Sequence, residues 1–161
     1  MTASSRVWKF GDDVNTDLII PGRYLDNYDS SHLAAHAMEG ASKDFAKNVS
    51  TGDIIVAGKN FGCGSSREQA VIALKHAGVS VVVAESFARI FYRNAINLGL
   101  PVMLSRDAHE ELEDGDRVVV DLEGLTVKGS GRRVSTLEPL PAHLEEILDC
   151  GGLVPYIKAR L

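Results

Sequence analysis

The chain has only two cysteines among its 161 residues, and this scarcity limits its chemistry. Cys63 and Cys150 are too few for a disulfide framework. Alone, they also cannot hold a four-thiolate cluster or a structural zinc ion. The simplest setting for such a chain is a reducing, cytoplasmic one.

The sequence also lacks an excess of basic residues. Lys and Arg number 17 against 22 Asp and Glu, which gives a net charge of -5. A general nucleic-acid surface requires the opposite balance, so we expect no nucleic-acid partner. There is no apolar run long enough to span a bilayer and no apolar core of a signal peptide, so we expect no membrane association. We expect one domain, residues 1–161, with a C-terminal helical segment at about 141–161.

The most informative stretch is a glycine-rich loop at residues 58–69. The apolar residues 53–57 before it are typical of a buried strand. Residues 70–78 after it predict a helix that ends at a glycine. The glycines of this loop permit backbone conformations closed to other residues, and they let a ligand approach the main chain.

Within the loop, the residues favour an anion site. Ser65 or Ser66 is expected to cap the helix, and Glu68 would complete a capping box with Ser65. A helix start carries free N–H groups and partial positive charge, and Arg67 adds a full charge in the first turn. The stretch therefore predicts a carboxylate or phosphate cradle with a serine hydroxyl at its centre.

The remaining pattern favours an α/β fold with three layers and a mixed, partly parallel sheet. Residues 79–84 are nearly all β-branched, as in a central parallel strand covered on both faces. Strand, helix and strand at this spacing indicate a right-handed crossover. Residues 117–122 and 125–128 flank Glu123-Gly124, a two-residue hairpin signal, so the second half should be antiparallel.

Residues 86–99 predict a helix between an N-cap at Ser86 and a glycine at Gly99. Arg89 and Arg93 lie four residues apart on one side of it. Either both arginines face water, or one of them reaches over the anion cradle, because ligands of open α/β sheets collect beyond the carboxyl ends of parallel strands. The sequence favours neither interpretation.

Several familiar motifs are absent from the loop. The order of its glycines and serines does not match the hydrolase nucleophile elbow, the nucleotide P-loop or the dinucleotide fingerprint. Cys63 could act as a nucleophile near a helix start, but no histidine is adjacent in sequence. Three aspartates within 11–17 are better explained by an Asx-rich turn than by a calcium loop. His32 and His36 lack a third ligand and are better explained as ordinary histidines.

Three segments carry a family resemblance: GDDVNTDLIIP at 11–21, GCGSSRE at 62–68 and SFARIFYRNAINLG at 86–99. Together they resemble the small-subunit family of 3-isopropylmalate dehydratase, which is similar to the swivelling C-terminal domain of aconitase. The resemblance covers the chain from about Trp8 through the last predicted strands.

The resemblance implies a catalytic role for Ser65, which matches the serine that removes a carbon-bound proton. Arg67 matches an arginine that binds a substrate carboxylate, and Ser66 would also contact substrate. A separate large subunit would hold a [4Fe-4S] cluster, in a heterodimer or heterotetramer, and this chain alone would bind no metal. Cys63 lies where aconitases carry an acidic residue, so we expect it to serve packing or tuning.

For the substrate, the resemblance directs attention to the loop after residue 21, with Arg23 and Asp26 as candidate selectors. A small dicarboxylate is implied, foremost 3-isopropylmalate and 2-isopropylmaleate in leucine biosynthesis. Asp26 would repel a third carboxylate unless Arg23 turns inward, and it does not clearly favour an isopropyl group. Methylmalate, dimethylmalate and homoaconitate enzymes therefore stay open, as does a non-catalytic carboxylate-binding module.

Overall fold

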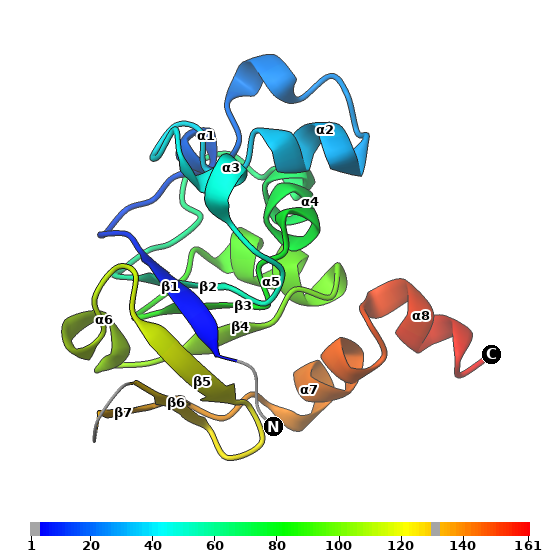
Figure 1. The fold of residues 1–161 in the computed structure, drawn as a ribbon. Helices are drawn as coiled ribbons and strands as arrows, with labels where there is room; N and C mark the ends of the chain where they lie inside the picture. The colour runs from blue at the N-terminus through cyan, green and yellow to red at the C-terminus, as the bar shows by residue number, and fades with distance from the viewer. Residues whose placement is uncertain (1–3, 130–132) are drawn as a thin grey trace.

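The computed structural model describes residues 4–129 and 133–161, and Figure 1 shows their arrangement. A seven-stranded sheet runs through the domain in the order β4-β3-β2-β1-β5-β6-β7. The strands are β1 Ser5–Lys9, β2 Ile54–Ala57, β3 Val81–Ala84, β4 Val102–Leu104, β5 Arg117–Asp121, β6 Thr126–Lys128 and β7 Val134–Thr136. Strands β1 to β4 are parallel, whereas β5, β6 and β7 join antiparallel. The predicted mixed, partly parallel sheet is confirmed.

The helices gather mainly on one side of the parallel strands (Figure 1). They are α1 Thr16–Ile19, the 3-10 turn η1 Gly22–Tyr24, α2 Ser30–Ala35, α3 Phe45–Asn48, α4 Glu68–Ala77, α5 Arg89–Asn97, α6 Ala108–Glu111, α7 Ala142–Asp149 and α8 Leu153–Lys158. Helix α7 packs on the body through Leu144, Ile147 and Leu148, whereas α8 projects at the C-terminal end (Figure 1). Over the described ranges, 4–129 and 133–161, no helix is long and apolar enough to cross a membrane.

Alternating side chains of β2 divide the core into two apolar clusters. Ile55 and Ala57 pack into the larger one, with residues of helices α1 to α5. Ile54 and Val56 pack into the smaller one, with side chains of α6 and of the antiparallel strands. Because successive residues of a strand point to opposite faces, a strand buried on both faces must be apolar throughout. The layers are therefore helices, parallel strands, and the antiparallel strands with α6.

The structure corrects two details of the antiparallel half. The hairpin register pairs Asp121 with Thr126, so four residues form its loop instead of the predicted two. Strand β7, which pairs with β6, was not predicted. It has three residues, of which only Ser135 is buried, so the sequence there carries almost no apolar alternation.

Candidate active site

The glycine loop is the middle of three extended segments that follow β1, β2 and β3. On one side, the Gly62 amide donates to the Val14 carbonyl (2.7 Å), and the Thr16 amide donates to the Cys63 carbonyl (2.9 Å). On the other side, the Ala88 amide donates to the Phe61 carbonyl (2.9 Å). The carboxyl ends of parallel strands share one edge of a sheet, so three sequence motifs far apart in the chain meet there.

Gly62 lets this loop approach α5 closely. Its φ is +84°, and a Cβ at this position would collide with the ring of Phe91. Phe61, the residue before Gly62, is fully buried. Its ring lies edge-on to the Phe91 ring, with 5.2 Å between the two ring centroids. The base of the loop is therefore packed against α5, whereas Ser65 and Ser66 further along are exposed.

A groove of about 260 Å³ runs along the loop, and we call it the serine groove. It is lined by Thr16, Gly62, Gly64, Ser65, Ser66, Arg67, Ala88, Arg89, Ile90, Phe91 and Asn94. The structure thus brings Ser65, Ser66 and Arg67 together, as the sequence predicts. It also answers the question left open for α5: Arg89 lines the groove, whereas Arg93 does not.

Helix α4 begins at Glu68, so the predicted serine N-cap and capping box are wrong. Arg67 occupies the N-cap position in an extended conformation, and no side chain of the described residues caps the helix. Cys63 is bridged to Asn15, and the chain bends at Gly64 and Ser65 before the first helical turn starts at Glu68. As a consequence, the first N–H groups of α4 stay available to an anion, and the serine hydroxyls are not used as caps.

Ser86 is also not the cap that its sequence position predicts. Helix α5 begins at Arg89 after Ala88, and the Ser86 hydroxyl oxygen accepts a hydrogen bond from the Asn60 amide at 2.8 Å. Residues 86–88 stay extended because they pair with the glycine loop. The predicted C-terminal glycine is correct, since Gly99 has a φ of +83° directly after the cap residue.

Asp17 is a site residue that the sequence reasoning missed. The Arg67 guanidinium donates from Nη1 to Asp17 Oδ1 at 2.6 Å and to the Ile20 carbonyl at 3.3 Å. Asp17 is carried by α1, whose N-cap Asn15 accepts from the Leu18 amide. The signal lay in the aspartate-rich turn, which we assigned only to local backbone capping. Asn15 does cap locally, but Asp17 holds the arginine of another motif.

The candidate selectors Arg23 and Asp26 are not in the serine groove. Arg23 donates to Glu39 Oε1 at 2.8 Å and lines a different pocket of about 420 Å³. Asp26 is exposed in the turn between η1 and α2. The loop is nevertheless tied to the start of α4, because Gln69 donates from Nε2 to the Leu25 carbonyl at 3.2 Å.

Glu39 is the polar centre that holds this loop. It accepts from Arg23 and from the Tyr24 hydroxyl, and it pairs with the His36 ring. Burial by itself raises the pKa of Glu39, but the hydrogen bonds from Tyr24 and His36 outweigh it, so this pKa lies below its ordinary value. His36 also stacks on Tyr24 with 3.7 Å between ring centroids. Stacking on Tyr24 and the contact with the Glu39 carboxylate therefore explain the position of His36.

The arrangement defines a class of α/β domain that carries a glycine-rich loop with exposed serines at the carboxyl edge of its parallel strands. The chain belongs to the aconitase C-terminal domain family, whose profile matches residues 13–107. That range contains Asp17, the glycine loop and Arg89.

Similar proteins cover nearly the whole chain. The 3-isopropylmalate dehydratase small subunit of Syntrophus aciditrophicus is 50% identical over 99% of this chain and 98% of its own length. The methanogen homoaconitase small subunit of Methanothermobacter thermautotrophicus is 56% identical over 94% of this chain and 88% of its own. A crystal structure of 3-isopropylmalate dehydratase from Methanocaldococcus jannaschii matches with a TM-score of 0.94 at 50% identity, covering 99% of this chain and 95% of that one. The resemblance found in the sequence is confirmed.

Proposed function

We propose that this chain is the small subunit of a [4Fe-4S]-dependent hydro-lyase that isomerises 3-isopropylmalate through 2-isopropylmaleate in leucine biosynthesis. The observation that carries the proposal is the exposed serine groove, in which Ser65 stands beside Arg67 and Arg89. Near-full-length similarity to 3-isopropylmalate dehydratase small subunits supports the same reaction.

In this proposal, Ser65 is the base that removes a carbon-bound proton. A serine hydroxyl is a poor base, so its alkoxide needs stabilisation. The uncapped start of α4 offers N–H groups, and the guanidinium groups of Arg67 and Arg89 line the same groove. These interactions strengthen when a closing partner excludes water from the site. Exposure of Ser65 in the isolated chain agrees with a site that is completed by another surface.

Arg67 is the proposed ligand of one substrate carboxylate. Its ion pair with Asp17 holds the guanidinium, with 16% of the side chain exposed, at the rim of the groove. Arg89 forms no ion pair within the described part of the chain and is proposed to bind the second carboxylate. Ile90 and Phe91 add apolar surface, which suits an alkyl substituent.

The iron–sulfur cluster is proposed to belong to a large partner subunit. Within residues 4–129 and 133–161, no three His, Cys, Asp or Glu side chains converge as metal ligands would. Cys63 is half-buried in the glycine loop, whereas Cys150 is exposed at the end of α7, so the two thiols do not form a ligand set. When bound, such a cluster would supply Lewis-acid activation of the substrate hydroxyl. This chain would bind, orient and deprotonate the substrate.

Substrate choice separates the main proposal from a second candidate. The homoaconitase relative makes a homoaconitate substrate the alternative. We propose a dicarboxylate substrate, because the serine groove offers two arginines, Arg67 and Arg89, whereas Arg23 is engaged by Glu39 outside it. If the loop keeps this arrangement on partner binding, a dicarboxylate is preferred.

The test is co-expression with a cluster-bearing large subunit, followed by hydration assays on 2-isopropylmaleate, citraconate and cis-homoaconitate. Ser65→Ala should lower kcat for the best substrate by about 10²- to 10⁴-fold, the usual contribution of a positioned base. Ser80→Ala, at the opposite end of β3, is the matched control and should leave kcat unchanged. Activity of this chain alone, or full activity of the Ser65→Ala complex, would refute the proposal. Preference for cis-homoaconitate would select the second candidate.

A further inference from the structure

Asn94 lines the serine groove, but the proposed roles of Ser65, Arg67 and Arg89 leave it unused. The residue lies on α5, four positions after Ile90 and five after Arg89, which line the same groove. Residues four apart share one face of a helix, and each Cα–Cβ bond tilts toward the helix N-terminus. The Asn94 amide therefore reaches back along α5 toward the arginine at its start.

The side-chain amide of Asn94 is half-buried and has no hydrogen-bond partner among the described residues. The asparagines whose side chains do form hydrogen bonds there are Asn15, Asn27, Asn48 and Asn60. No fully buried side-chain nitrogen or oxygen of the described residues lacks a partner, so the unpaired Asn94 amide is open to the groove. An amide carries two N–H donors and one acceptor oxygen, and a ligand in the groove can use them.

The groups around the Asn94 amide favour an anionic ligand. Arg89 forms no ion pair within the described part of the chain. Helix α5 begins without a side-chain cap among the same residues, so its start keeps partial positive charge. A carboxylate accepts up to about four hydrogen bonds, more than one guanidinium supplies in a bidentate contact. The Asn94 amide can supply a further donor to a carboxylate that Arg89 binds.

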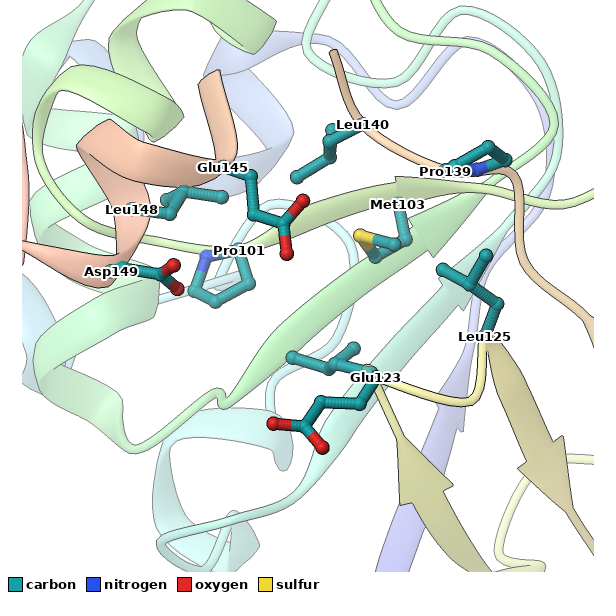
Figure 2. Close-up of a pocket in the computed structure, with 10 residues that line it drawn as sticks. Pro101, Met103, Glu123, Leu125, Pro139, Leu140, Glu145, Leu148 and Asp149 are labelled. Carbon is teal, nitrogen blue, oxygen red and sulfur yellow. The ribbon is translucent and has the colours of Figure 1, made fainter. Parts of the chain in front are cut away.

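Another groove of the molecule has the opposite charge. It has a volume of about 300 Å³ and lies between the β5–β6 loop, β4 and α7 (Figure 2). The carboxylates of Glu123 and Glu145 stand on two sides of an apolar floor where Met103 lies, and Asp149 also lines this groove. None of its lining residues is basic, so it repels a dicarboxylate. It shares no residue with the serine groove.

We propose that Asn94 is a substrate-binding residue, whose Nδ2 amide donates to the substrate carboxylate that Arg89 binds. The identity of that substrate rests on the proposed function, whereas the carboxylate subsite on α5 does not. Because Asn94 is neutral, it adds direction to the contact and no charge. Its short side chain has fewer rotatable bonds than arginine, so it fixes where the carboxylate lies relative to the helix.

The test is equilibrium binding of succinate, a plain dicarboxylate, to the assembled complex by isothermal titration calorimetry. Asn94→Ala should raise Kd about 10- to 100-fold, the loss expected for one hydrogen bond to a charged group. Asn94→Asp keeps the shape of the side chain but replaces donors with negative charge, so it should raise Kd further. Asn97→Ala is the matched control, because Asn97 is half-buried on the same helix but does not line the serine groove. Its Kd should equal that of the wild type.

Steady-state kinetics with the best substrate separate a binding role from a structural one. Asn94→Ala should raise KM by a factor similar to that for Kd and leave kcat within about threefold, as expected for a contact made equally in the ground and transition states. Loss of kcat with unchanged KM would overturn the proposal.

Three binding results would also overturn the proposal. These are a wild-type complex that does not bind succinate, an equal loss in Asn97→Ala, and an Asn94→Asp complex that binds as well as Asn94→Ala. Succinate binding needs no turnover. A complex that binds succinate through Asn94 but hydrates none of the three test substrates would therefore refute the proposed function and leave the carboxylate subsite standing.

Discussion

Asp17 is expected to act through Arg67, and its removal is the most direct test of how the glycine loop is held. The substitution Asp17→Asn keeps the size of the side chain and removes its charge. Arg67 Nη1 lies 2.6 Å from Asp17 Oδ1, and the same nitrogen lies 3.3 Å from the Ile20 carbonyl oxygen. Asp17→Asn removes the charge from the shorter contact and leaves the longer contact with the Ile20 carbonyl oxygen unchanged. The Arg67 guanidinium is therefore held less tightly at the rim of the serine groove.

The expected magnitudes for stability and activity differ. The side chain of Asp17 is 66% exposed, and exposed ion pairs contribute about 0–1 kcal/mol to folding. For a domain of this size the Tm should therefore fall by no more than about 4 °C. Catalysis is more sensitive, because a displacement of about 1 Å in a substrate-positioning group can cost about 10²-fold in rate. We expect kcat/KM of Asp17→Asn to fall by about 10- to 100-fold, mainly through KM.

The assay is steady-state kinetics of the assembled complex with 2-isopropylmaleate, together with a thermal melt of the small subunit. Combining Asp17→Asn with Arg67→Gln should cost no more than Arg67→Gln alone, because both changes disable one guanidinium. Asp44→Asn is the matched control, since Asp44 is exposed and makes no capping hydrogen bond within the described residues. Additive losses in the double variant would refute a positioning role, as would an equal loss in Asp44→Asn.

Two further predictions concern α5 and the loop. Arg89→Gln should raise KM at least about tenfold, because one charge-assisted contact with the substrate is lost. Arg93→Gln is the control, since Arg93 lies on the same helix but outside the serine groove, and its KM should not change. Equal effects of the two substitutions would contradict a substrate-binding role for Arg89. Gly62→Ala should lower the free energy of unfolding by about 2–5 kcal/mol, measured by urea denaturation, because the position needs positive φ and a methyl group would collide with Phe91. A loss below about 0.5 kcal/mol would show that the loop relaxes around the added methyl group.

The strands and helices near the site were largely predictable, but their ends were not. Apolar and β-branched runs identified β2 and β3 because both faces of these strands are buried. The predicted start of α4 was wrong because serine propensity at helix starts is local, whereas Cys63 bridges to the distant Asn15 segment and the chain bends at Gly64 and Ser65 before the helix. Ser86 was misassigned for the same reason, since its hydroxyl oxygen accepts from the distant Asn60. Cross-strand partners of this kind are invisible to local pattern reasoning.

By itself, the sequence determined that the chain forms an α/β domain and carries a glycine-rich loop with two serines beside an arginine, because these depend on residue type and spacing within short segments. Only the tertiary structure decided which charged side chains share that loop. It brought Asp17 to Arg67 across 50 positions, placed Arg89 in the serine groove, and turned Arg23 toward Glu39. The physical reason is that pairing of parallel strands sets which loops are neighbours, and helix direction sets which face of α5 meets the loop.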